Sequence, residues 1–141
     1  MKKDGAEAYI AYMHWGNEFQ LQQTTTQQEI AQKLCDLGYN AIIGGHPHVI
    51  QPAAVLTGSN GNKTFCIYST GNALSNQRLG KLKECSTAHT EDGILFEITF
   101  EKYSDGKVYI QSADILPTWV NLHWVDGGGN EYNMIPLYAD Q

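Results

Sequence analysis

The sequence is poor in basic residues, and the few that it has are scattered. Lysine and arginine number 9 against 15 aspartates and glutamates, which gives a formal net charge of -6 at pH 7. Proteins that bind the nucleic-acid backbone gather lysine and arginine into a patch that neutralises phosphates. The sequence has no such patch, so we exclude nucleic acid as a partner.

Cysteine and long apolar segments are also scarce. The cysteines, Cys35, Cys66 and Cys85, are odd in number and lack paired spacing, so they predict neither a disulfide framework nor a zinc knuckle. We interpret them as small buried residues, with Cys85 as a candidate free thiol. No apolar run approaches the roughly 20 residues that cross a bilayer, and residues 1–10 lack the apolar core of a secretory signal. The chain as given is therefore expected to be soluble.

The N-terminal part of the sequence predicts a strand, a helix and a second strand. Residues 8–14 form an apolar run of the length expected for a strand buried on both faces. Thr26 and Glu29 fit a capping box, which predicts a helix over residues 27–37. Residues 40–45 form a second short apolar run. This order predicts a βαβ unit, whose two strands run parallel.

The remaining sequence predicts antiparallel strands joined by turns. Asn60-Gly61 and residues 104–106 are turn sequences that each separate two strand-like runs. The predicted strands are residues 53–57, 64–68, 93–102 and 107–113. The tail, residues 117–137, predicts one or two further strands packed over the sheet.

The length and composition suit one domain that spans residues 1–141. A hydrophobic content of 42% over 141 residues supports a single core. We therefore predict the α/β (α+β) class, with a mixed sheet sandwich in which one βαβ unit is followed by antiparallel strands.

Three histidines are predicted to meet at one edge of the sheet. His14 ends the first strand of the βαβ unit and His46 ends the second, and the C-terminal ends of parallel strands share the edge where open α/β sheets bind ligands. An extended backbone through Pro47 would turn the ring of His48 to the same side as that of His46. Neutral imidazole is a common ligand of zinc, manganese and iron. The pattern predicts a divalent-metal or oxyanion site.

Simpler interpretations stay open for several of these residues. His46 and His48 would also suit a turn in which both rings bond to backbone groups. Glu18 is either a ligand or general base at this edge, or a solvated loop residue. Asn72 either leans towards the site or caps a turn.

Two further histidines, His89 and His123, have no partner at ligand spacing. We interpret both as surface or packing residues.

Three segments together resemble a known family. HWGNEF at 14–19, LGYNAIIGGHPHVIQP at 37–52 and IYSTGNALSNQ at 67–77 are similar, in order and separation, to the second half of the poly-gamma-glutamate capsule biosynthesis proteins of the CapA/PgsA type. The resemblance covers residues 8–100 well and the tail loosely. It implies that the chain is the C-terminal half of a domain with the fold of calcineurin-like metallophosphoesterases.

The resemblance also implies a metal-dependent, hydrolase-like site. His14, His46 and His48 match the family's histidine ligands, and Glu18 and Asn72 would be catalytic outer contacts. The cofactor would be a divalent manganese, zinc or iron ion. The substrate would be a phosphoester or an anionic polymer.

The departures from the family pattern limit this expectation. The first half of the pattern, with an aspartate motif, a further acidic residue and an Asn-Asn-His motif, has no counterpart here. Asn17-Glu18 is not the superfamily's GNH[DE] motif, because it lacks the histidine, and Ala73 replaces the usual phenylalanine. Two divalent ions ~3.7 Å apart repel by roughly 18 kcal/mol at an effective dielectric constant of 20, so a dinuclear site needs more anionic ligands. We expect at most one weakly bound ion and poor catalysis.

The alternative function is a non-enzymatic accessory or binding module of a capsule polymer assembly complex, whose other components would be its partners. The resemblance implies a place at the bacterial cell surface, outside the cell, with a membrane anchor in the full-length protein. A half-domain should also expose a sheet edge, which predicts homo-oligomers.

Overall fold

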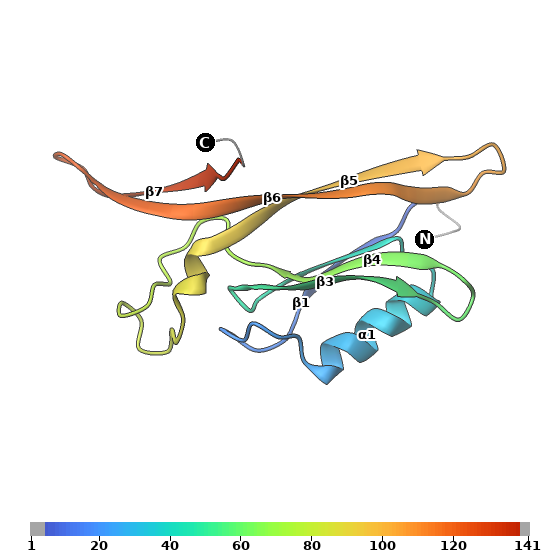
Figure 1. Cartoon of the computed structure of the whole chain (residues 1–141), viewed down its shortest axis with the longest axis horizontal. Helices are drawn as coiled ribbons and strands as arrows, with labels where there is room; N and C mark the ends of the chain where they lie inside the picture. Colours follow the sequence, from blue (N-terminus) through green and yellow to red (C-terminus); the bar gives the residue numbers. More distant parts are fainter. Residues whose placement is uncertain (1–4, 139–141) are drawn as a thin grey trace.

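A computed structural model describes residues 5–138 of the chain as two β-sheets and one α-helix (Figure 1). The strand order is β1-β2-β4-β3 in the first sheet and β5-β6-β7 in the second. The elements are β1 (Ile10–His14), α1 (Thr25–Asp36), β2 (Ala41–Gly45), β3 (Ile50–Thr57), β4 (Lys63–Thr70), a 3-10 helix η2 (Ala88–Glu91), β5 (Asp92–Lys102), β6 (Val108–Val125) and β7 (Gly129–Pro136). The predicted α/β (α+β) class is confirmed. Across residues 5–138, no helix has both the length and the apolar character of a membrane span.

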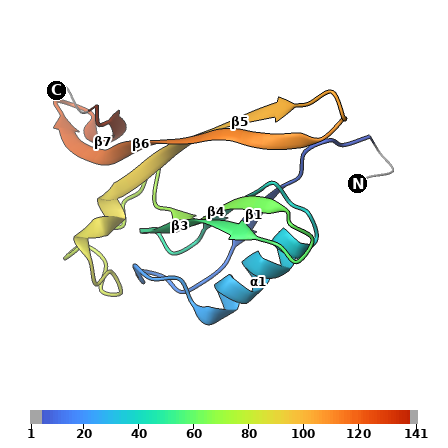
Figure 2. The ribbon, with the colours of Figure 1, turned by 45° about the vertical axis from the view of Figure 1, so that its right-hand side comes forward.

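The predicted βαβ unit is present. β1 pairs in parallel with β2, and β2 pairs in parallel with β4. α1 covers the face of the first sheet that points away from the second sheet (Figure 2). The core on this face consists of Trp15, Ala31, Ile42, Cys66 and Tyr68. Burying this apolar face stabilises the unit by about 25 cal/mol per Å² of surface removed from water.

The expected burial of the first strand on both faces is wrong. Ala11 and Met13 pack against the core, whereas Ile10 and Tyr12 are 51% and 73% exposed. The reason is that the second sheet packs mainly over β3 and β4, so the second face of β1, at the edge of the first sheet, stays uncovered. The second sheet meets the first at β4, where the rings of Phe65 and Phe96 stack 4.7 Å apart.

The start of α1 also differs from the prediction. The N-cap is Thr24, and the capping box joins Thr24 to Gln27, two residues before the predicted pair of Thr26 and Glu29. Threonines at 24, 25 and 26 are equally suitable caps by sequence. The tertiary structure selects the first of them, because Gln27 is then buried and bonds to Gln51.

Both predicted hairpins form, but the tail does not pack over the first sheet. β3 pairs antiparallel with β4, and β5 pairs antiparallel with β6. β6 continues past the end of β5 and there pairs with β7, so the tail extends the second sheet instead. Figure 1 shows β5 and β7 along opposite ends of β6. Each half of β6 thus has its own hydrogen-bonded partner.

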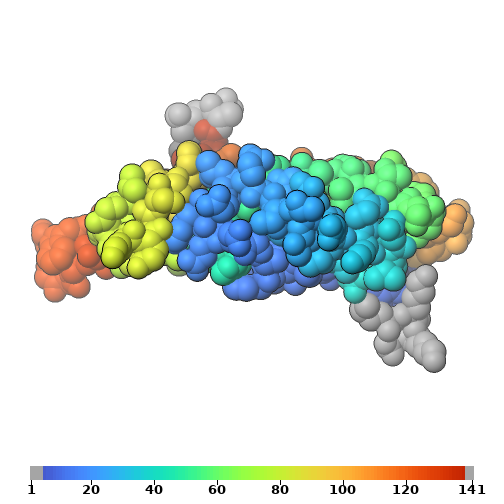
Figure 3. Space-filling model, turned by 90° about the horizontal axis from the view of Figure 1, so that it is seen from below, coloured from blue at the N-terminus to red at the C-terminus, as the bar shows by residue number. Residues whose placement is uncertain are grey.

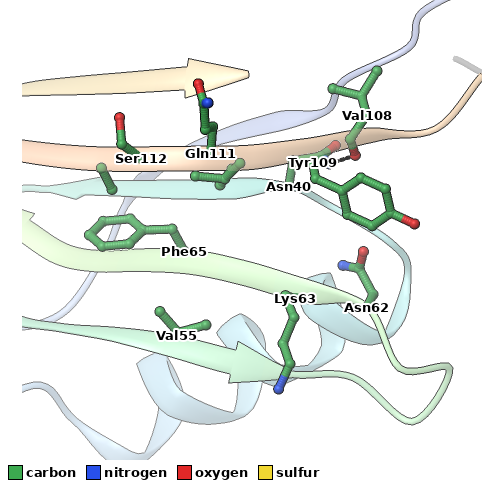
Figure 4. Close-up of a pocket in the computed structure, with 11 residues that line it drawn as sticks. Asn40, Val55, Asn62, Lys63, Phe65, Val108, Tyr109, Gln111 and Ser112 are labelled. Atoms are coloured by element: carbon green, nitrogen blue, oxygen red, sulfur yellow. Dashed lines mark hydrogen bonds between the residues drawn. The ribbon is translucent and has the colours of Figure 1, made fainter. Parts of the chain in front are cut away.

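A cavity of about 350 Å³ lies between the two sheets (Figure 4). Val55, Phe65 and the start of β6 line it. The amide of Asn40 donates to the carbonyl of Val108, and that of Asn62 donates to backbone carbonyls, so these polar groups are already satisfied. The cavity lies at the N-terminal ends of β2 and β4, away from the histidines at the C-terminal ends.

Candidate metal centre

Three histidine rings lie at the C-terminal rim of β1 and β2. His14 is the last residue of β1, and His46 directly follows β2. The ring centroids of His14 and His46 are 4.5 Å apart, and those of His46 and His48 are 6.0 Å apart. The parallel strands therefore bring the three rings together, while their role as metal ligands stays a prediction.

The backbone route between the rings differs from the expected one. His46 and His48 have φ angles of 97° and 60°, so the chain through Pro47 is not extended. Positive φ is uncommon for residues with a side chain and costs on the order of 1–3 kcal/mol. The chain adopts it because it must reverse between β2 and β3. Pro47 is fully buried and its carbonyl accepts from the N–H of Phe19 at 2.8 Å, which holds the turn.

A carboxylate reaches the same rim from the loop after β1. The Oε1 atom of Glu18 lies 3.7 Å from Nε2 of His48. One ligand atom each from Glu18, His46 and His48 lies within 4.8 Å of the other two. Ligands of a tetrahedral zinc ion sit roughly 3.4 Å apart, since the bonds are ~2.1 Å. Small side-chain rotations would therefore let the three groups bind one ion.

His14 lies beside this set and is not part of it. Its side chain is on the exposed face of β1, and its ring is tilted by 41° against that of His46. A bond from His14 to an ion shared by the other three groups requires its ring to move closer.

Asn72 contacts a candidate ligand. Its Oδ1 atom lies 3.0 Å from Nδ1 of His48, and its Nδ2 atom donates to the carbonyls of His48 and Thr90 and to Oε1 of Gln77, at 3.0 to 3.3 Å. Because Nδ2 faces acceptors, the amide oxygen faces the imidazole, and Nδ1 of His48 is the donor. Nε2 of the neutral ring then keeps its lone pair on the side of Glu18.

The loop after β1 and the segment between β4 and η2 lie at the same end of the first sheet. In Figure 3 the blue residues of the loop lie next to the yellow-green residues of that segment. Glu18 and Asn72 come from these two segments, and they reach His48 from different sides.

The structure reveals supporting groups that sequence reasoning missed. Trp15 donates from Nε1 to the carbonyl of Tyr68 at 2.8 Å, and a Cβ on Gly44 would lie 1.9 Å from that carbonyl oxygen. The glycine pair before the histidine turn was a usable signal for this close approach. Gln51 is buried and donates a hydrogen bond to the loop of Glu18. No pattern in the sequence indicates this supporting role.

The other histidines lie outside the site. His89 pairs with Asp92 at 2.8 Å and His123 pairs with Glu131 at 3.2 Å, on exposed surface. The interpretation of both as surface or packing residues agrees with this, since His89 is exposed and His123 is partly buried.

The cysteines are buried, as expected, and all three are free thiols: Cys35, Cys66 and Cys85. Burial raises the pKa of Cys66 to about 12, which disfavours its reactive thiolate.

Comparison with known proteins places the chain in a family. The family described as "Bacterial capsule synthesis protein PGA_cap" matches residues 1–77, which include Glu18, the three histidines of the rim and Asn72. The "PGA biosynthesis protein CapA" of Bacillus subtilis (strain 168) is 28% identical over 113 residues, which are 80% of this chain and 26% of the relative. The "Capsule biosynthesis protein CapA" of Bacillus anthracis is 30% identical over 83 residues, which are 59% of this chain and 19% of the relative.

The chain spans only about a quarter and a fifth of the lengths of these two curated relatives. The family match, however, covers more than half of the chain itself. This chain therefore belongs to the bacterial capsule synthesis protein family PGA_cap.

Proposed function

We propose that the chain binds one divalent metal ion, of manganese, zinc or iron, at the rim where Glu18, His46 and His48 meet. The observation that carries the proposal is the 4.8 Å cluster of their ligand atoms. The donor set fits such an ion, because imidazole nitrogen and carboxylate oxygen are ligands that these metals accept. His14 would join as a fourth ligand after a movement of its ring.

The site would serve a phosphoesterase-like reaction in capsule biosynthesis. A bound divalent ion polarises phosphoryl oxygens and activates water near neutral pH. The reacting bond would be a phosphoester or a related bond. Poly-gamma-glutamate, whose own chain is joined by amides, is instead a candidate anionic polymer for the rim to bind, because the Bacillus subtilis relative is named for PGA biosynthesis. The rim offers one carboxylate among its ligand groups, so we expect one ion and slow turnover from this chain alone.

Calorimetric titration with Zn²⁺ and Mn²⁺ tests the site. Wild-type protein should bind one equivalent, and His46→Ala or His48→Ala should weaken binding by about 10-fold or more, since each removes a ligand. His89→Ala is the matched control, because His89 pairs with Asp92 on the surface, and it should bind like the wild type. No uptake by the wild type, or equal losses in the control, would overturn the proposal.

A non-enzymatic binding module is the second candidate. Two features of the cluster favour the binding module. The cluster has a single carboxylate, Glu18, and the side chain of Glu18 is 47% exposed. Hydrolysis of a chromogenic phosphoester separates the two functions. Activity of this chain or of a version extended upstream supports the enzyme, and activity of neither supports the module.

Location and partners are part of the same proposal. We place the protein at the cell surface, anchored to the membrane in its full-length form, together with other components of a capsule synthesis complex. We propose that residues 1–141 form the C-terminal half of a metallophosphoesterase-like domain. This would account for the sheet edge that β1 leaves open. We propose that copies of the chain self-associate through this edge.

A further inference from the structure

We infer that Gln51 and Gln27 are positioning residues that hold the Glu18 loop, residues 15–24, against the histidine rim. The inference rests on the proposed metal site and adds to it the device that brings the carboxylate into place. The hydrogen bonds of the two glutamines go to other residues than the three candidate ligands. Both are only 1% exposed.

Gln51 supports the last part of the loop. Its Nε2 atom donates to the carbonyl of Gln20 at 2.8 Å and to that of Gln22 at 3.2 Å. Its Oε1 atom accepts from Nε2 of Gln27 at 2.9 Å. Every polar atom of this buried amide is therefore used. Its backbone is fixed in the first sheet, where Gln51 lies opposite Ser69 of β4.

Gln27 supports both ends of the loop. Its Oε1 atom accepts from the backbone N–H of Thr24 at 2.8 Å, which fixes the end where α1 begins. At the other end the loop passes directly over the same side chain at Gly16. A Cβ there would lie 2.7 Å from Oε1 of Gln27, and the φ of Gly16 is +82°. Only glycine allows this approach without displacing Gln27.

Glu18 depends on this support because its own side chain is weakly held. Its contact to His48 is 3.7 Å, longer than a hydrogen bond, and about half of the side chain is exposed. The neighbouring residue, Phe19, has a φ of 62° and donates its N–H to Pro47. The place of the carboxylate is thus set by the loop backbone, which rests on the glutamine pair and on the histidine turn.

Metal binding requires that the carboxylate of Glu18 be placed accurately. Ligands must lie within about 0.5 Å of productive geometry to bind an ion well. A loosened loop would keep the imidazoles in place and lose the contribution of the carboxylate. Gln51 should therefore affect metal affinity through Glu18 and not through the histidines.

A double-mutant cycle tests this coupling by Zn²⁺ titration. Gln51→Met removes the hydrogen bonds at similar volume and should weaken binding about 10-fold in the wild-type background. In the Glu18→Gln background, Gln51→Met should weaken Zn²⁺ binding by less than about 2-fold, because the effects of two residues that act together do not add. Gln32→Met is the matched control, since Gln32 bonds to Asp36 on the surface, and it should change neither value. Equal losses in both backgrounds would overturn the inference.

Hydrogen exchange without metal gives a second readout. Gln51→Met should lower the protection of the Phe19 amide at least about 10-fold while the amides of β2 and β4 keep theirs. If Gln51→Met does not fold, Gln27→Met must show the same coupling and the same local loss. Failure of the wild type to bind Zn²⁺ would overturn the metal site, and unchanged protection at Phe19 would separately overturn the positioning role.

Discussion

Nδ1 of His48 donates to Oδ1 of Asn72 over 3.0 Å, in the orientation that the other contacts of the asparagine amide impose. In the neutral form of the ring, this hydrogen bond leaves the lone pair on Nε2 of His48, on the side of Glu18. Asn72 therefore acts on any bound ion through His48. A group that hydrogen-bonds to a histidine ligand in this way orients the ring and fixes its tautomer.

Asn72→Ala should weaken metal binding about 10- to 100-fold, because His48 loses its fixed ring orientation and tautomer. It should also lower the free energy of unfolding by about 1–3 kcal/mol, since the carbonyl of Thr90 loses its donor. Titration and urea unfolding measure the two effects. Asn133→Ala is the control, as Asn133 is exposed on β7, away from the rim. An unchanged affinity for Asn72→Ala would show that His48 is held without it.

Gly44→Ala should destabilise the fold by about 3 kcal/mol or more. The added Cβ would lie 1.9 Å from the carbonyl oxygen of Tyr68 and 2.5 Å from Nε1 of Trp15, so two strands must separate. Gly128→Ala is the matched control, because its Cβ would make only ordinary contacts near 3.8 Å. Urea unfolding monitored by tryptophan fluorescence compares the two. Equal stability of both variants would contradict the close packing of β2 against β4.

The native thiols should resist modification. A thiol reagent at pH 8 should label none of Cys35, Cys66 and Cys85 in the folded protein and all three in urea, because each is buried. Labelling of one native cysteine would show local opening at that site.

The raised pKa of Cys66 should make stability depend on alkaline pH. Between the ordinary thiol value of about 9 and the folded value of about 12, the unfolded thiol ionises and the folded thiol does not. Unfolding then releases a proton, so the free energy of unfolding falls as the pH rises through this window. The stability difference between wild type and Cys66→Ala should shrink over the same range. A constant difference would contradict burial of the thiol.

Tyr12→Lys should suppress self-association. Tyr12 is 73% exposed on the edge strand β1, and a lysine on an edge opposes strand pairing. We expect the dissociation constant of the dimer to rise about 10-fold or more, measured by light scattering on a sizing column. Ala53→Lys on the opposite edge strand, β3, where Ala53 is exposed, is the control and should leave association unchanged. A monomeric wild type at high concentration would overturn the edge proposal.

Several features of the fold were predictable from the sequence. Apolar runs and turn dipeptides marked the βαβ unit and both hairpins, because strand and turn preferences are set by residues close in the chain. The same local reasoning placed His14 and His46 at strand ends. Parallel pairing then implied that they share one rim, as the structure shows.

Features that depend on distant residues were not predictable. Tyr12 is exposed because the second sheet packs mainly over β3 and β4 and leaves β1 uncovered. The choice of Thr24 as N-cap follows from the buried contact of Gln27 with Gln51. The left-handed turn at His46 and His48 is held by a contact with Phe19, which lies far away in the sequence.

The sequence by itself determined which side chains end the strands and which family the motifs resemble. Only the tertiary structure decided that Glu18 faces His48 and that Asn72 orients it. Strand ends are encoded by neighbouring residues, whereas these contacts join separate loops, and their geometry exists only after the sheet has brought those loops together.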